Sequence, residues 1–137
     1  MIEFVYGAKG SGKTKKMIEM ANAEVERAKG EILFINDRDK YRVTVDTKIR
    51  FVNSDDFEIS GIDELYGFVS GVIAGNYDVD VVYIDNLLRI IDADGPADIE
   101  PLLSKLDLIQ KGQNIKFVLS LSCEEKDIPD CVKKYLN

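Results

Sequence analysis

The sequence predicts a single α/β domain, built as a three-layer sandwich with a mostly parallel sheet and helices on both faces. Short apolar runs alternate along the chain with longer segments whose apolar residues recur every three or four positions. The length of 137 residues fits one domain spanning residues 1–137. Hydrophobic residues make up 45% of the chain, which is enough to form a buried core and argues against global disorder.

Two strands and one helix are predicted in the first part of the chain. Residues 2–6 (IEFVY) and 32–36 (ILFIN) are short apolar runs rich in β-forming residues, as expected of buried strands. Between them, residues 13–29 carry apolar side chains at helical spacing, and Gly30 follows as a stop signal.

The polar segment 37–60 allows two interpretations. Its β-forming runs 43–45 (VTV) and 49–53 (IRFVN) are short enough to form a hairpin with each other. Alternatively, only residues 49–53 join the main sheet, as an edge strand.

A second helix and a third strand are predicted next. Residues 60–75 place Ile, Leu, Tyr and Val side chains on one stripe, and Ser60 with Asp63 resembles a capping box at the start. Residues 79–85 (VDVVYID) form an apolar run that ends in an acid, which predicts a buried strand ending at Asp85.

The last third of the chain repeats the alternation. Residues 98–111 read as a helix with Pro101 in the first turn, where its missing N–H is tolerated. Residues 115–122 (IKFVLSLS) read as a fourth strand, and a short final helix is expected to start at residues 127–129.

Charge and composition exclude several classes of function. The net charge of −7 argues against nucleic acid and anionic membranes as partners, since both need a basic surface. No apolar run approaches the roughly 18 residues needed to span a bilayer, and residues 1–7 lack a secretory signal pattern, so we expect a cytoplasmic protein. Cys123 and Cys131 are expected to be reduced thiols, and the lack of histidine excludes His-activated nucleophiles and the usual zinc sites.

The segment GAKGSGKT at residues 7–14 is the most specific feature of the sequence. It matches G-x-x-x-x-G-K-[ST], follows a predicted strand and opens a predicted helix, as a phosphate-binding loop requires. Backbone N–H groups converge on a phosphate chain only if the loop wraps tightly, which the glycines permit, and the helix adds its positive N-terminal end. We therefore expect the cofactor to be bound by Gly7, Ala8, Lys9, Gly10, Ser11, Gly12, Lys13 and Thr14.

Three further roles follow from this loop. Lys13 is expected to reach the β- and γ-phosphates, and the Thr14 hydroxyl to bind Mg²⁺. Asp85 ends a strand where ligands of parallel sheets collect, so it is expected to hold Mg²⁺ through water rather than only to cap the turn after it. Catalysis, if present, is expected to involve Lys13, Asp85 and Asn86.

These motifs resemble those of the P-loop NTPase superfamily, with GAKGSGKT as Walker A and VVYID (residues 81–85) as Walker B. The order of elements resembles the RecA-like ATPase branch, which inserts an extra strand between the strands carrying the two motifs. The resemblance implies that Ser120 or Ser122, in residues 115–122, senses the γ-phosphate, although a serine satisfied within the strand is the favoured reading.

The catalytic base is the point at which the sequence departs from that branch. A glutamate often follows the Walker B aspartate there, whereas Asn86 follows it here, and an amide cannot accept a proton. Glu124 and Glu125 are substitutes, although a solvated turn explains them better. Five arginines are candidates for stabilising charge, with a surface role favoured for each: Arg27, Arg38, Arg42, Arg50 and Arg89.

Three functions remain open at this stage. The first is a Mg²⁺-dependent NTPase that is slow, or activated by a partner, either a second copy of the chain or another protein that completes the site. The second is a nucleotide-binding switch without useful catalysis, which Asn86 favours. The third is a small phosphotransferase (kinase), for which Asp37 and Asp39 are only scattered base candidates. ATP is the default nucleotide, because no NKxD-type guanine-reading loop is present, and GTP remains an alternative.

Overall fold

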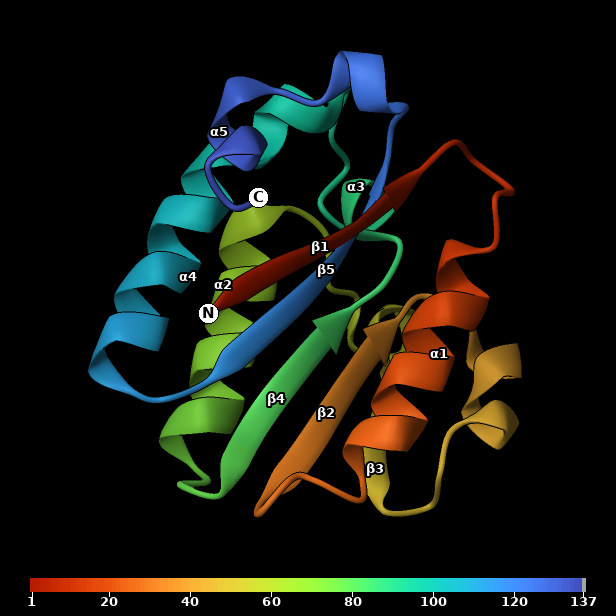
Figure 1. Ribbon diagram of the computed structural model, residues 1–137. Helices are drawn as coiled ribbons and strands as arrows, with labels where there is room; N and C mark the ends of the chain where they lie inside the picture. The colour runs from red at the N-terminus through yellow and green to blue at the C-terminus, as the bar shows by residue number, and fades with distance from the viewer. Residues whose placement is uncertain (137) are drawn as a thin grey trace.

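The computed structural model describes residues 1–136 and confirms the three-layer α/β sandwich. Its sheet has five strands in the order β1-β5-β4-β2-β3 (Figure 1). All four neighbouring pairs are parallel. The strands are β1 (Ile2–Gly7), β2 (Glu31–Asn36), β3 (Ile49–Asn53), β4 (Val79–Ile84) and β5 (Lys116–Ser122).

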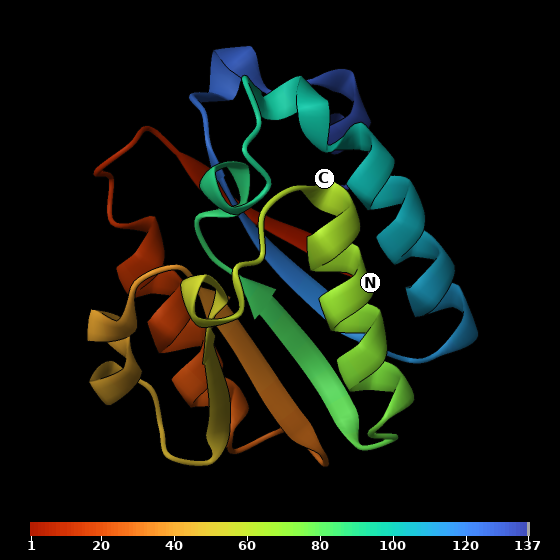
Figure 2. The same ribbon diagram turned by 180° about the vertical axis from the view of Figure 1, so that it is seen from behind.

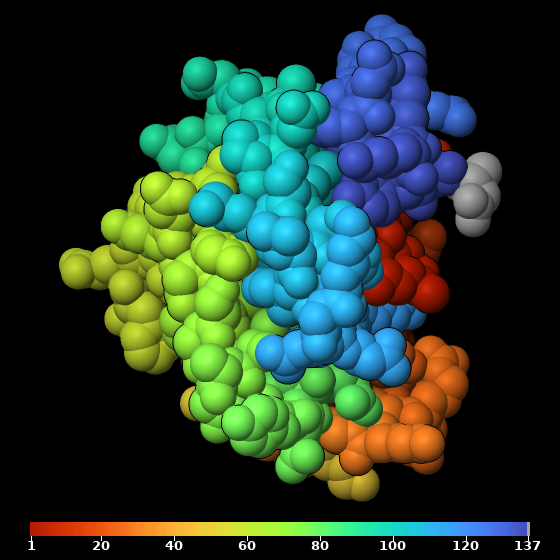
Figure 3. All heavy atoms as spheres, turned by 90° about the vertical axis from the view of Figure 1, so that its left-hand side faces the viewer, coloured from red at the N-terminus to blue at the C-terminus, as the bar shows by residue number. Residues whose placement is uncertain are grey.

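Helices cover both faces of this sheet. The helix α1 (Lys13–Glu24) and the 3₁₀ helix η1 (Asp39–Thr44) lie on one face, toward the viewer of Figure 1. The helices α2 (Ile62–Ala74) and α4 (Glu100–Gly112) lie on the other face (Figure 2) and pack side by side there (Figure 3). The short elements are α3 (Leu87–Ile90), α5 (Asp130–Lys133), η2 (Ser54–Phe57), η3 (Pro96–Ile99) and η4 (Glu125–Asp127).

Each face of the sheet has its own hydrophobic cluster. Under α1, the ring of Phe34 stacks between those of Phe51 and Tyr83, with ring centroids 5.9 and 5.8 Å apart. The opposite cluster is larger and joins α2 and α4 to the sheet through Leu65, Val69, Leu102, Leu106, Val82 and Ile84. Because the central strands are buried on both faces, they read as continuous apolar runs in the sequence.

Two expectations about the first half of the chain are corrected. The helix α1 ends at Glu24 rather than at residue 29, because its last turn tightens and the Arg27 N–H donates to the carbonyl of Glu24 at 2.9 Å. The hairpin is wrong, since residues 49–53 pair in parallel with β2 as the edge strand. The run 43–45 is instead held in and beside η1, where the Asn22 side chain of α1 donates to the Thr44 carbonyl at 3.1 Å.

Helix ends in the second half also differ from expectation. The capping box of Ser60 with Asp63 is absent; the Ser60 N–H donates instead to the Glu64 carboxylate at 2.8 Å, which lies one residue further along the helix. The helix predicted for residues 98–111 is divided into η3 and α4, with Pro101 at the start of α4. The final helix α5 begins at Asp130, after η4.

The strand order determines where the predicted motifs meet. The strand β5 lies between β1, which leads into the glycine-rich loop, and β4, which leads into Asp85. The carboxyl ends of all five parallel strands lie at the same edge of the sheet, so polar residues after β1, β2, β4 and β5 gather there. Within residues 1–136, no helix is both long and apolar enough to cross a membrane.

Candidate functional site

The loop of residues 7–14 joins the end of β1 to the start of α1, as predicted. Gly10 and Gly12 have φ angles of +81° and +90°, in the left-handed region that side chains rarely adopt. A Cβ atom at Gly7 would lie 2.6 Å from the Ser11 hydroxyl oxygen, so the Ser11 side chain would have to rotate away. Gly10 and Gly12 therefore shape the loop through their backbone conformation.

The side chain of Lys13 turns back toward the loop that precedes it. Its ammonium donates to the Ala8 carbonyl at 2.9 Å. Burial lowers the pKa of Lys13 below its ordinary value, and the nearby Asp85 and Cys123 partly oppose that shift. The ammonium therefore lies against the backbone of the loop.

Thr14 and Asp85 meet although 71 residues separate them in the sequence. The Thr14 hydroxyl donates to the Asp85 carboxylate at 2.5 Å, and the side-chain amide of Asn36 donates to the same oxygen at 2.9 Å. Asp85 is only 1% exposed, so these hydrogen bonds offset much of the cost of burying its charge. Asn36 is completely buried at the end of β2, and no motif in the sequence indicated it.

Asn86 has an unusual backbone and a fixed side chain. Its φ of +59° lies in the left-handed region, and its N–H donates to the Ser120 hydroxyl at 2.8 Å. Its side-chain amide donates to Asp37 Oδ1 at 2.9 Å. Ser120 is therefore a buried serine satisfied within the sheet, which agrees with the favoured reading of that residue.

Asp37 also binds Arg89, which belongs to α3. The guanidinium donates through Nη2 to Asp37 Oδ1 at 2.7 Å and through Nε to the other carboxylate oxygen. Burial alone would raise the pKa of Asp37, but the hydrogen bonds from Arg89 and Asn86 outweigh it and hold the pKa below its ordinary value. Asp37 is consequently a charged acceptor of three hydrogen bonds beside Asn86.

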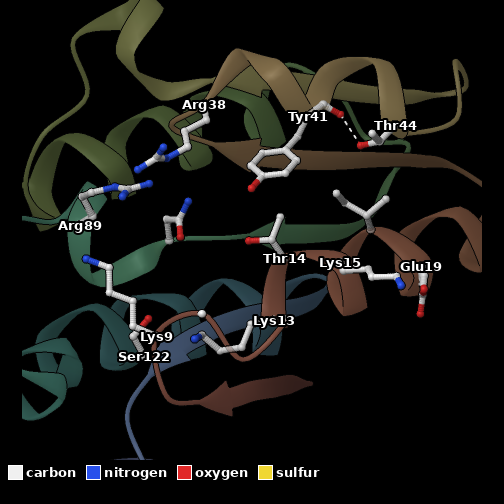
Figure 4. A pocket seen from close by; sticks show the side chains of 14 residues that line it. Lys9, Lys13, Thr14, Lys15, Glu19, Arg38, Tyr41, Thr44, Arg89 and Ser122 are labelled. Atoms are coloured by element: carbon white, nitrogen blue, oxygen red, sulfur yellow. Dashed lines mark hydrogen bonds between the residues drawn. The ribbon is translucent and has the colours of Figure 1, made fainter.

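These residues surround a cavity of about 580 Å³ at the carboxyl edge of the sheet (Figure 4). Five cationic side chains line it, together with one carboxylate, that of Glu19. A concentration of positive charge in a chain of net charge −7 indicates an anionic ligand. The full lining is Lys9, Gly10, Gly12, Lys13, Thr14, Lys15, Ile18, Glu19, Arg38, Tyr41, Thr44, Asn86, Arg89 and Ser122.

The remaining candidates divide between the cavity and the surface. Ser122 lines the cavity, as do Arg38 and Arg89, for which a surface role was favoured. Arg42 pairs with Asp39 outside the cavity. Glu124 and Glu125 are exposed and lie away from the cavity, in agreement with a solvated turn.

Three residues of the glycine-rich loop do not line the cavity. They are Gly7, Ala8 and Ser11. No group of three or more His, Cys, Asp or Glu side chains that could hold a metal occurs in residues 1–136. The expected metal ligands, Thr14 and Asp85, would supply two hard oxygen donors, so a bound Mg²⁺ would need phosphate and water oxygens to complete its shell.

Comparison with known proteins supports the fold and leaves the function open. No model of a known protein family matches the sequence, and neither does any curated protein. Among solved structures, the chain is similar to the flagellar accessory protein FlaH from Methanocaldococcus jannaschii, with a TM-score of 0.56 and 11% sequence identity. The match covers 97% of this chain and 65% of that structure, so the likeness is one of fold.

Proposed function

We propose that the chain binds a nucleoside triphosphate with Mg²⁺, ATP by default or GTP, with its phosphates in the loop of residues 7–14. The observation that carries this proposal is the 2.5 Å hydrogen bond from Thr14 to Asp85. It places the hydroxyl at the start of α1 against the acid that ends β4, beside a loop with glycines at the required positions. A strand-to-helix turn without a ligand would not need this pairing.

The charges of the cavity support a polyanionic ligand. Lys9, Lys13 and Lys15 contribute from the loop and α1, and Arg38 and Arg89 contribute from the opposite wall. A triphosphate carries several negative charges, which backbone N–H groups, a helix N-terminus and these side chains would bind together. The fold supports the same conclusion, since β5 between β1 and β4 matches the RecA-like order of strands.

Mg²⁺ fits the oxygen donors present. Thr14 and Asp85 would hold it, Thr14 by its hydroxyl and Asp85 through water, and Asn36 would keep the carboxylate in position. When bound, the cation would neutralise charge that develops on the phosphates. Lys13 would exchange the Ala8 carbonyl for phosphate oxygens.

Hydrolysis by this site would be slow, or would depend on a partner. The side chain that follows Asp85 is the amide of Asn86, which cannot take the proton of an attacking water. We therefore propose a weak or partner-activated NTPase, with a second copy or another protein as the activating partner. The same observation favours a second candidate, a nucleotide-binding switch without useful hydrolysis.

Calorimetric titration with Mg²⁺-ATP and Mg²⁺-GTP tests the binding proposal, and phosphate release from the same samples separates NTPase from switch. Lys13→Ala should weaken binding roughly 10- to 150-fold, since hydrogen bonds to charged groups contribute about 1.5–3 kcal/mol. Lys16→Ala is the matched control, because Lys16 is exposed and absent from the cavity wall. Equal affinities for Lys13→Ala and the parent would refute the proposal.

A further inference from the structure

Arg89 and Asp37 form a pair at the edge of the cavity, with the cation on the wall and the acid behind it. The Arg89 side chain is 42% exposed, whereas that of Asp37 is only 10% exposed. Arg89 belongs to the cavity lining, and Asp37 does not. In Figure 4 the guanidinium lies on the wall opposite Lys9 and Lys13.

The two partners differ in how firmly they are held. Asp37 directly follows β2 and accepts an additional hydrogen bond from the Asn86 amide, and the Asn86 backbone is anchored by Ser120 in β5. Arg89 reaches Asp37 from the short helix α3 through a long side chain. Arg89 can therefore change partners by rotating its side chain, while Asp37 and Asn86 keep their places.

We infer that Arg89 exchanges Asp37 for the terminal phosphate when a nucleoside triphosphate enters the cavity. The protein would thereby bind a triphosphate more tightly than a diphosphate. The inference rests on the proposed function. It also assigns to a residue of the same chain the arginine that such sites commonly receive from a partner.

The chemistry of the two acceptors supports this exchange. A phosphate offers the guanidinium the same two-pronged hydrogen bonding as a carboxylate and carries more negative charge. A triphosphate held by the loop would supply a terminal phosphate facing the wall with Arg89. A diphosphate lacks that group, so Arg89 would stay on Asp37.

The exchange would also change the basicity of Asp37. While it is paired with Asp37, Arg89 helps to hold the pKa of that carboxylate low, which makes Asp37 a poor proton acceptor. Loss of the guanidinium would leave the carboxylate with the Asn86 amide and its own backbone N–H as donors. Binding of a triphosphate would therefore make Asp37 more basic, whereas binding of a diphosphate would not.

The test compares affinities for Mg²⁺-ATP and Mg²⁺-ADP by calorimetry in four proteins: the parent, Asp37→Asn, Arg89→Ala and the double variant. Removing Asp37 first matters, because an unpaired Asp37 in the single Arg89→Ala variant would itself repel phosphate. In the Asp37→Asn background, Arg89→Ala should weaken Mg²⁺-ATP binding at least 10-fold and change Mg²⁺-ADP binding less than 3-fold. Asp37→Asn alone should strengthen Mg²⁺-ATP binding relative to Mg²⁺-ADP.

Controls separate this arginine from other basic residues. Arg42→Ala is the matched control, because Arg42 is also paired with an acid, Asp39, but lies outside the cavity. Arg38→Ala tests the other arginine of the wall. Arg89→Lys keeps the charge, is the variant most similar to the parent, and should still lose most of the preference for triphosphate because lysine lacks the planar fork.

Equal losses for ATP and ADP on removing Arg89, or no loss for either, would overturn the exchange. Selectivity that disappears with Arg38→Ala and survives Arg89→Lys would also overturn it. If the parent binds both nucleotides and Lys13→Ala weakens both, the proposed function stands and only the exchange has failed. If the parent binds neither nucleotide, both proposals fall.

Discussion

Gly12 offers a sharp test of the loop, because its backbone conformation is unfavourable for any residue with a side chain. Its φ is +90°, and a Cβ built on it would meet no atom within 4 Å. Gly12→Ala should therefore introduce backbone strain without a steric clash, costing about 1–2 kcal/mol. With an unfolding entropy near 2.1 cal/mol/K per residue, that loss corresponds to a fall in Tm of roughly 3–7 °C.

Gly67 provides the matched control within the same protein. It lies inside α2, and a Cβ there would also meet nothing within 4 Å. Its φ is ordinary, so Gly67→Ala should stabilise the helix by about 0.5–1 kcal/mol. The two substitutions add the same methyl group and should shift stability in opposite directions.

Differential scanning calorimetry measures both shifts, and titration with Mg²⁺-ATP measures their effect on the site. Gly12→Ala should melt lower and bind more weakly, whereas Gly67→Ala should melt higher and bind as the parent does. A Gly12→Ala protein that melts at or above the parent and keeps its affinity would refute the reasoning about the loop backbone.

Three further predictions concern the site and the core. Asp85→Asn should weaken the Mg²⁺ dependence of nucleotide affinity, measured in titrations with and without EDTA; an unchanged Mg²⁺ dependence would contradict the metal role. Ser120→Ala should lower the free energy of chemical unfolding by about 1–3 kcal/mol, because it leaves the Asn86 N–H unpaired. Ser122→Ala should leave that free energy unchanged, and equal effects would contradict a structural role for Ser120 alone. Burial, aided by Glu24 and Glu3, raises the pKa of Tyr83 to about 12. The unfolded chain therefore loses this proton first, and stability should fall between about pH 10 and 12 by up to about 2.7 kcal/mol from this group. Alkaline unfolding curves of Tyr83→Phe should show a correspondingly smaller loss.

Local patterns in the sequence were sufficient for the sheet and for one half of the site. Apolar runs bounded by polar residues located four strands, and the fixed spacing from Gly7 to Thr14 located the loop at the end of β1. Asp85 was placed correctly because it directly follows an apolar run. Each of these features depends on neighbours in the sequence.

The other half of the site depends on which strands lie next to each other. Asn36 and Asp37 reach Asp85, Asn86 and Arg89 only because β2 pairs with β4, a pairing that no local pattern specifies. The prediction of a strand at residues 43–45 failed for a related reason. The β-forming residues there are outweighed by hydrogen bonds to Asn22 of α1, which lies more than 20 residues earlier in the chain.

The position of β1 at one edge of the sheet has a consequence for biosynthesis. Within residues 1–136, β1 pairs only with β5, so the strand that leads into the glycine-rich loop waits for a partner that begins at Lys116. At about 5–20 residues per second, the ribosome would take roughly 6–25 seconds to supply β5 after β1. Until then, neither strand can complete the sheet that aligns Thr14 with Asp85. Nucleotide capture by nascent chains of increasing length should therefore appear abruptly once β5 has left the exit tunnel.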